Sequence, residues 1–247
     1  MTGENGLIRP GETLDELLPG GWRIIQKRDG YRFSLDPVLL CAFAAIGSTD
    51  KICDLGTGSG VIPLLLAGAN PAATILGIEV QPDLADRARR NVELNGLRER
   101  VTILEVDLRR IREALPAESC RAVLANPPYR RPATGRMSPH SERALARHEV
   151  QGGLIDFVDA AAWLLPTGGR FFLVYLAERM AELLAIMRQG ALEPKRLRCI
   201  HSRFGEEARM VLVEGRKGSG PGLKVEPPLY VYEGEDYSLE IKAIYGR

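Results

Sequence analysis

The chain has 247 residues, with 33 basic and 32 acidic side chains and a formal net charge of +1. This length suits one mixed α/β core and is small for two domains, and the balanced charge does not by itself indicate a nucleic-acid partner. The N-terminus lacks the apolar core of a signal peptide, and no apolar run reaches the 18 residues of a membrane span. We therefore expect a cytoplasmic protein that does not enter a membrane.

The first 50 residues are expected to be an extension that precedes the main domain, residues 51–247, within a single globular unit. Residues 12–30 predict a short helix and a strand that contains Trp22, and residues 35–46 predict a helix opened by Ser34 or Asp36.

A strand, a glycine turn and a helix open the main domain. The apolar run 51–55 is followed by Gly56-Thr-Gly-Ser-Gly60 and by the helical run 61–69. A dinucleotide fingerprint would place its third glycine at Val61, and Asp54 would repel a pyrophosphate. The pattern instead favours a ligand that carries an amine or a sulfonium, although an ordinary tight turn is the alternative interpretation.

Carboxylates also close the next two predicted strands. Strand 74–80 carries Glu79, 23 positions after Gly56, and strand 101–107 ends on Asp107. An acid about 20 residues beyond a glycine turn commonly holds ribose hydroxyls, and the second acid could reach an adenine amine. Each acid alone is an ordinary solvated residue, but their order along the chain places them at the carboxyl edge of a parallel sheet, where ligands bind.

The most informative motif is Asn126-Pro-Pro-Tyr129, which follows the short apolar run 121–125. It combines a side-chain amide, carbonyl groups fixed by two prolines and a flat ring. Acceptors that bind both N–H hydrogens of a planar amine could free its lone pair for attack on an electrophile. The alternative is a proline-rich loop that caps a strand.

The remaining pattern alternates helices with strands, which predicts a parallel sheet with helices on both faces. Segments 195–201 and 208–215 are expected to pair antiparallel at one edge, and the tyrosines of the tail are expected to serve packing. The other predicted elements are helices 82–96, 154–165 and 178–189 and strand 170–176.

The four cysteines, at positions 41, 53, 120 and 199, show no Cys-x-x-Cys spacing. We expect reduced thiols and no metal site.

Together, Asp54 to Gly60, Glu79, Asp107 and Asn126 to Tyr129 resemble the ordered motifs of class I S-adenosylmethionine-dependent methyltransferases, in the branch that methylates amino nitrogens. Segment 30–36, Ala146-Arg-His-Glu149 and the strand pair 193–197 and 210–217 resemble the tRNA1(Val) adenine N6-methyltransferase family. The resemblance implies a Rossmann-like fold with a seven-stranded, mostly parallel sheet, one antiparallel edge strand and helices on both faces.

The resemblance also implies a role for each matching residue. S-adenosylmethionine is the implied cofactor, and N6-methylation of an adenine in tRNA is the implied reaction. Asn126, Pro127 and Tyr129 are the implied catalytic residues. The implied cofactor-binding residues are Arg32, Phe33, Asp36, Asp54, Gly56, Gly58, Gly60, Glu79, Asp107, Leu108 and Asn126.

An arginine-rich stretch follows the Asn-Pro-Pro-Tyr motif. Residues 130–148 hold five arginines and one acid. Arginine binds phosphate bidentately, so Arg130, Arg131 and Arg136 are candidate RNA contacts, whereas a solvated loop is the alternative. We expect tRNA as partner and a monomer or homodimer.

Three other functions remain open. The same motif serves glutamine N5-methyltransferases of release factors, and guanine N2-methyltransferases of ribosomal RNA share the chemistry. A cofactor-binding protein without catalytic activity is the alternative from a different class.

Overall fold

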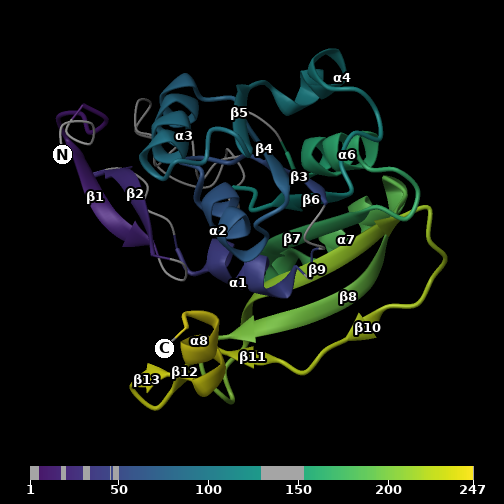
Figure 1. Ribbon diagram of the computed structural model, residues 1–247. Helices are drawn as coiled ribbons and strands as arrows, with labels where there is room; N and C mark the ends of the chain where they lie inside the picture. Colours follow the sequence, from purple (N-terminus) through teal and green to yellow (C-terminus); the bar gives the residue numbers. More distant parts are fainter. Residues whose placement is uncertain are drawn as a thin grey trace, which may run out of the picture.

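A mostly parallel β-sheet forms the centre of the molecule (Figure 1). The computed structural model describes residues 6–17, 21–29, 34–44, 46, 50–128 and 153–246. In these ranges the central sheet has the strand order β10–β8–β9–β7–β6–β3–β4–β5, and β11 also pairs with β8. Its strands are β3 (Lys51–Leu55), β4 (Thr74–Glu79), β5 (Val101–Glu105), β6 (Ala122–Ala125), β7 (Arg170–Leu176), β8 (Leu192–His201), β9 (Ala208–Lys217), β10 (Lys224–Val225) and β11 (Leu229–Tyr230).

Helices cover both faces of this sheet. One face carries α1 (Asp36–Phe43), α2 (Val61–Ala69) and α3 (Pro82–Leu94). The other carries η1 (Leu108–Arg110), α4 (Ile111–Ala114), α6 (Leu154–Leu164) and α7 (Met180–Gln189), which η3 (Ala177–Arg179) precedes. The predicted α/β class with helices on both faces is therefore confirmed.

Two predicted details of the sheet need correction. The seven long strands are present, but the two-residue strands β10 and β11 extend the sheet beyond β8. The antiparallel strand is β9, and it lies between β7 and β8 rather than at the edge. A two-stranded hairpin can join a sheet through either strand. The apolar run Met210 to Val213 of β9 suits a strand that is covered on both faces, whereas β8 carries Lys195, Arg196 and Arg198. The inner position of β9 therefore buries the more apolar of the two strands.

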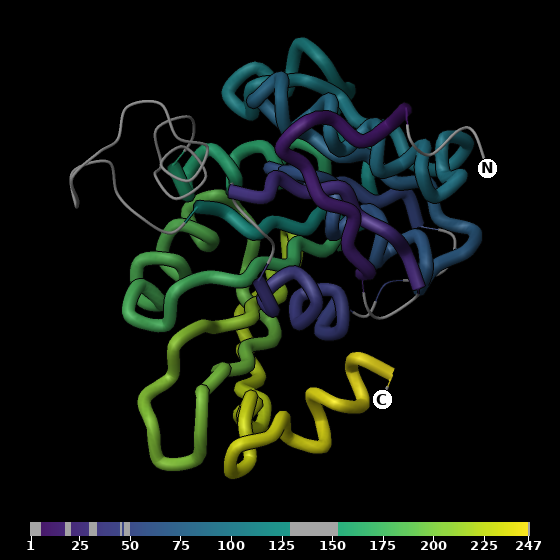
Figure 2. Tube along the Cα trace, turned by 90° about the vertical axis from the view of Figure 1, so that its left-hand side faces the viewer, coloured from purple at the N-terminus to yellow at the C-terminus, as the bar shows by residue number. Residues whose placement is uncertain are grey.

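In the N-terminal extension, residues 12–27 form a β-hairpin instead of the predicted short helix and strand, whereas the predicted helix 35–46 is present as α1. Strands β1 (Glu12–Leu17) and β2 (Trp22–Lys27) pair antiparallel, with Glu12 opposite Lys27 and Leu17 opposite Trp22. The pairing with β2 overrides the helical preference of the Leu- and Glu-rich segment. Figure 2 shows this hairpin lying across α2 and α3, both of which contact β2.

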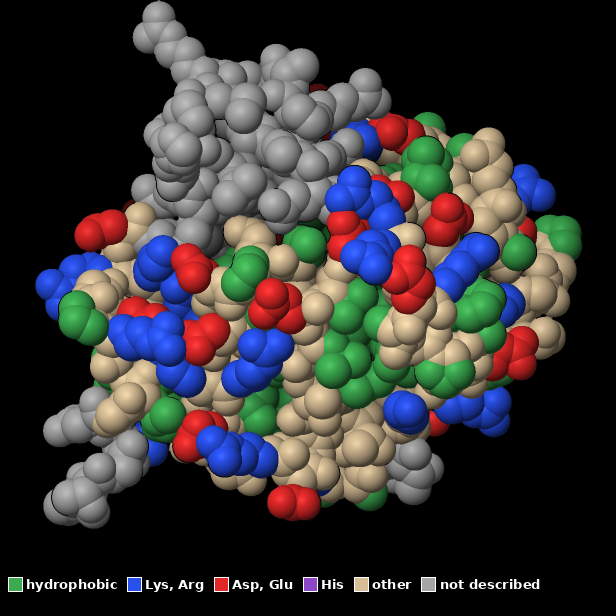
Figure 3. Space-filling model, turned by 90° about the horizontal axis from the view of Figure 1, so that it is seen from above, with side chains coloured by type: hydrophobic (Ala, Val, Ile, Leu, Met, Phe, Trp, Pro, Cys, Tyr) green, Lys and Arg blue, Asp and Glu red, His purple; other side chains and the backbone are tan. Residues whose placement is uncertain are grey.

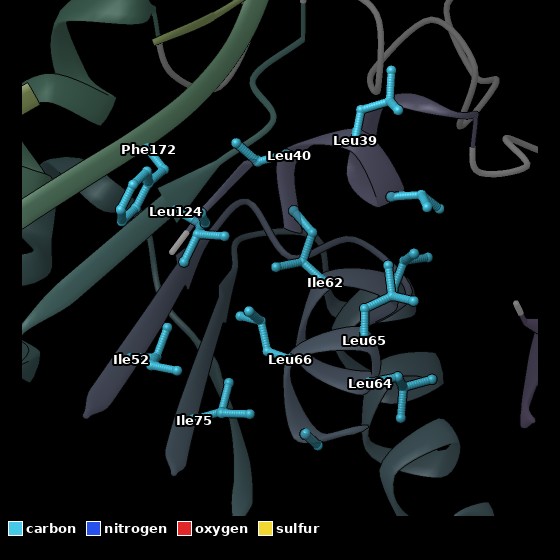
Figure 4. Close-up of a cluster of buried hydrophobic side chains, with 14 of the residues drawn as sticks. Leu39, Leu40, Ile52, Ile62, Leu64, Leu65, Leu66, Ile75, Leu124 and Phe172 are labelled. Atoms are coloured by element: carbon cyan, nitrogen blue, oxygen red, sulfur yellow. The ribbon is translucent and has the colours of Figure 1, made fainter. Parts of the chain in front are cut away.

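Apolar packing joins α1 and α2 to the sheet (Figure 4). Ile52, Ile75, Leu124 and Phe172 project from four strands toward Leu40 of α1 and its neighbours on α2. Fully buried aliphatic side chains contribute about 1.5–3 kcal/mol each, so this layer fixes the position of both helices over the sheet.

The C-terminal segment lies beside α1 (Figure 1). It contains the hairpin of β12 (Tyr232–Glu233) and β13 (Asp236–Tyr237), followed by α8 (Leu239–Ile244), which contacts α1. The rings of Tyr232, Tyr237 and Tyr245 stack on one another, with centroids 5.3 and 6.0 Å apart. These tyrosines pack against each other, in agreement with the prediction for the tail. None of the described helices is long and apolar enough to cross a bilayer.

Candidate active site

The carboxyl ends of β3, β4 and β6 meet at one edge of the sheet. The register pairs Leu55 with Ile78 on one side and with Ala125 on the other. The residues that follow, Gly56, Glu79 and Asn126, therefore stand at one level across three neighbouring strands. The structure thus brings the glycine turn, Glu79 as the predicted ribose ligand and the start of the Asn-Pro-Pro motif to one edge.

Backbone hydrogen bonds hold the glycine turn, residues 56–60. The N–H groups of Gly56 and Thr57 both donate to the Ile78 carbonyl at 2.9 Å, and the Gly60 N–H donates to the Thr57 carbonyl at 2.9 Å. Gly58 has a φ of +58°, and a Cβ at this position would meet no atom within 4 Å. The turn is rigid and leaves open space at Gly58, as close approach of a ligand requires.

Neighbouring helices approach the two outer glycines. A Cβ on Gly60, which has a φ of +87°, would lie 3.3 Å from the Cβ of Ala88 in α3. A Cβ on Gly56 would lie 3.2 Å from the ring of Phe157 in α6. These two glycines therefore serve the close packing of the turn, whereas Gly58 faces open space.

Asp54, two residues before the turn, is fully buried beside the Thr57 hydroxyl. Among the described residues, neither its carboxyl oxygens nor that hydroxyl has a partner of good hydrogen-bond geometry. Burial raises the pKa of Asp54 to about 8, with repulsion from Glu79 adding to the shift and the nearby Thr57 hydroxyl opposing it. Within the described residues these three buried polar atoms have at most one another as partners, which leaves room for a ligand to supply further ones.

Glu79 is buried but well partnered. One carboxylate oxygen accepts from the Gly58 N–H at 2.8 Å, and the other accepts from the Gln81 N–H at 2.9 Å. Burial raises the pKa of Glu79, and these backbone hydrogen bonds act in the opposite direction. A carboxylate can accept several hydrogen bonds, so Glu79 could also accept from a ribose hydroxyl.

Asp107 follows β5 and begins the short helix η1. Its carboxylate accepts from the Arg109 N–H at 3.0 Å and forms an ion pair with the Arg109 guanidinium. The hydrogen bonds from the Arg109 side chain lower the pKa of Asp107. The adjacent Leu108 is buried and packs with the residues beneath α6. Asp107 is thus an ionised acceptor at the far side of the same edge.

Asn126 and Pro127 begin the motif that follows β6. Asn126 is half-buried, and Pro127 is buried beside it. The predicted cofactor residue Asp36 begins α1, and its carboxylate accepts from the Ser34 hydroxyl at 2.8 Å. The other predicted site residues, Arg32, Phe33, Tyr129, Arg130, Arg131 and Arg136, lie outside the described residues.

Sequence reasoning missed two polar residues near the turn. Thr57 carries the buried hydroxyl beside Asp54, and the Asn91 side chain of α3 donates to the Ser59 carbonyl at 2.9 Å. A usable signal was present for Asn91. It lies four positions before Asn95 on the same side of an amphipathic helix, where a pair of amides needs partners.

The fold, the glycine turn and the acids at the ends of the strands together define a class I methyltransferase domain. A model of the family described as methyltransferase small domain matches residues 37–190, which is more than half of the chain. The chain belongs to this family and groups within it with the tRNA1(Val) (adenine(37)-N6)-methyltransferases.

Two curated relatives support this grouping. The tRNA1(Val) (adenine(37)-N6)-methyltransferase of Aeromonas hydrophila is 32% identical over 77% of this chain and 79% of its own length. The protein of the same name from Porphyromonas gingivalis is 30% identical over 75% of this chain and 74% of its own length.

Solved structures agree on the fold. A predicted O-methyltransferase from Agrobacterium tumefaciens has a TM-score of 0.69 and 26% identity, covering 85% of this chain and 95% of its own. An S-adenosylmethionine-dependent O-methyltransferase from Thermotoga maritima has a TM-score of 0.55 and 20% identity, covering 78% and 69%, and is similar in fold alone. The predicted family, fold class and enzyme class are therefore confirmed.

Proposed function

We propose that the protein transfers the methyl group of S-adenosylmethionine to the N6 amine of an adenine in tRNA. The observation that carries this proposal is the position of Asn126 and Pro127 at the level of Gly56 and Glu79. A motif suited to binding an amine thus starts beside the edge that suits the cofactor. The names of the relatives, which specify adenine 37 of a valine tRNA, support the choice of substrate.

The described residues suit the parts of the cofactor. Glu79 would accept from the ribose hydroxyls, and Asp107 would accept from the adenine amine beside the backbone of Leu108. The open space at Gly58 would admit the ligand close to the turn. Asp54, whose carboxyl oxygens lack partners, would face the cationic amino-acid portion, and Asp36 and the segment that contains Arg32 and Phe33 would close the site from α1.

When bound, S-adenosylmethionine supplies a methyl group on a sulfonium that is already activated for transfer. The protein therefore needs alignment more than acid or base catalysis. Oδ1 of Asn126 and the Pro127 carbonyl would accept the two hydrogens of the target amine, which leaves the nitrogen lone pair directed at the methyl group. Tyr129 would stack on the target base once it is unstacked from its neighbours.

RNA binding in this proposal depends on local charge rather than net charge. Figure 3 shows basic and acidic side chains interspersed over the described part of the face seen from above. We therefore assign the phosphate contacts nearest to the target base to Arg130, Arg131 and Arg136, which follow the catalytic motif in the sequence.

We further propose that residues 1–50 form an extension that acts as one unit with the cofactor domain, residues 51–247. The contacts of β2 in the extension with α2 and α3 in the cofactor domain support the proposal that the two parts act as one unit. In this proposal the enzyme is cytoplasmic and acts as a monomer or homodimer.

The test is to incubate the protein with methyl-labelled S-adenosylmethionine and with total RNA from cells that lack the protein. The labelled nucleoside is then identified. We expect label in N6-methyladenosine of the tRNA fraction. Label in a guanine, or no label in any RNA despite cofactor binding, would contradict the proposal, and in the second case a protein glutamine becomes the acceptor to test.

A further inference from the structure

Two asparagine side chains, Asn91 of α3 and Asn95 directly after its last residue, hold the N-terminal hairpin. Asn91 accepts from the Ile25 N–H at 2.7 Å and donates to the Ile25 carbonyl at 3.1 Å. Asn95 accepts from the Arg23 N–H at 2.9 Å and donates to the Arg23 carbonyl at 2.7 Å. Each amide therefore satisfies both backbone groups of one residue of β2, as a neighbouring strand would.

A buried ion cluster fixes the same hairpin to the same helix. Glu12 of β1 lies 2.7 Å from Arg90 and 3.2 Å from Arg87, and these three side chains are at most 10% exposed. Burial alone would raise the pKa of Glu12, but hydrogen bonds from Arg90, Arg87 and the Arg9 N–H hold it at about 2. The hairpin is thus firmly docked on α3 at neutral pH.

Only one of the two asparagines also reaches the cofactor turn. The Nδ2 group of Asn91, which is fully buried, donates a further hydrogen bond to the Ser59 carbonyl at 2.9 Å. The N–H of the same peptide unit belongs to Gly60 and donates to the Thr57 carbonyl at 2.9 Å. The Ser59–Gly60 peptide is therefore held at both ends, once within the turn and once by α3.

From these contacts we infer that Asn91 is a positioning residue that couples the docked hairpin to the cofactor turn. Undocking β2 removes two of the three hydrogen bonds that orient the Asn91 amide, and the Ser59 carbonyl then loses a fixed donor. The inference rests on the proposed function, because it requires that the glycine turn holds S-adenosylmethionine. Since coupling is reciprocal, cofactor binding must stabilise hairpin docking by the same factor by which docking strengthens cofactor binding.

The two asparagines provide a matched pair for the test. Calorimetry on the unaltered protein first establishes that S-adenosylmethionine binds, which tests the proposed function separately. Asn91→Ala is then expected to raise the Kd for S-adenosylmethionine about tenfold, as loss of one buried hydrogen bond to a binding element predicts. Asn95→Ala removes the contacts with Arg23 and a hydrogen bond to the Asn91 carbonyl but none with the turn. Because the Glu12 ion cluster still docks the hairpin and Asn91 keeps its three hydrogen bonds, its Kd is expected to stay within about twofold. Equal Kd values for the two variants would overturn the inference.

Amide hydrogen exchange on the unaltered protein keeps the inference testable if Asn91→Ala does not fold. Saturating S-adenosylmethionine is expected to slow exchange of the Ile25 and Arg23 amides severalfold, because both open when the hairpin undocks. In a folded Asn91→Ala protein, saturated with cofactor, this slowing at Arg23 is expected to disappear. An exchange rate at Ile25 and Arg23 that does not change when the cofactor binds the unaltered protein would overturn the coupling.

Discussion

The backbone of the glycine turn and the buried side chains of Asp54 and Thr57 differ in how their polar groups are partnered. Around the turn, the N–H groups of Gly56, Thr57 and Gly58 have partners within the protein, and Glu79 accepts two backbone hydrogen bonds. By contrast, the carboxyl oxygens of Asp54 and the Thr57 hydroxyl have no partner of good geometry among the described residues. The first region is organised without a ligand, whereas in the proposed function a ligand would supply partners to the second.

This difference separates three tasks that a methyltransferase site must perform. In the proposed function, the partnered region would position the cofactor, Asp54 and Thr57 would contact its amino-acid portion, and the motif after β6 would orient the acceptor amine. Changes in each region should therefore alter different measured quantities.

Loss of the Asn126 amide should have the largest effect. Asn126→Ala removes one acceptor for the target amine and is expected to lower kcat by about 100- to 1000-fold, the usual effect of deleting one transition-state hydrogen bond. The Kd for S-adenosylmethionine, measured by calorimetry, should stay within about twofold. Unchanged turnover in a folded Asn126→Ala protein would show that transfer occurs elsewhere.

Replacement of Asp54 should stabilise the ligand-free protein. The folded-state pKa of about 8 lies above the ordinary value of 3.8, so the folded state binds the additional proton and stability falls as pH rises between these values. Asp54→Asn is expected to raise the free energy of unfolding on the order of 5 kcal/mol at pH 8 and by little near pH 4. Urea denaturation at both pH values measures this difference. A gain that does not depend on pH would contradict the burial of an ionisable carboxyl group.

Glu79 should affect cofactor binding more modestly, and a neighbouring strand supplies its control. Glu79→Gln is expected to raise the Kd for S-adenosylmethionine about tenfold, because charge-assisted hydrogen bonds to the ribose become neutral ones. Glu105 stands opposite Glu79 in the register but is 43% exposed and paired with Arg89. Glu105→Gln should therefore leave the Kd nearly unchanged, and equal effects of the two substitutions would refute the assigned role.

Much of the fold could be read from local patterns. The strand 51–55, the helix 61–69 and the strand 170–176 have the predicted bounds, because alternation of apolar segments with turns depends on neighbouring residues. The inner position of β9 and the N-terminal hairpin depend on contacts between distant segments, which a local pattern does not contain.

The site was predictable to a similar extent. The order of Asp54, Glu79, Asp107 and Asn126 along the chain placed them at the ends of parallel strands, and the register brings Glu79 and Asn126 to one level. The ion pair of Asp107 with Arg109 depends on side-chain geometry that the sequence does not contain. The Asn91–Asn95 spacing indicated that these amides need partners, but not that Asn91 reaches the Ser59 carbonyl.

The central claim is that the site methylates the exocyclic amine of an adenine. The most direct test uses two synthetic anticodon stem-loops of the valine tRNA that differ only at position 37, one with adenine and one with purine, which lacks the N6 amine. With methyl-labelled S-adenosylmethionine, we expect label on the adenine-containing RNA and none on the purine-containing RNA. Equal label on both would contradict the assignment of the N6 amine as the acceptor.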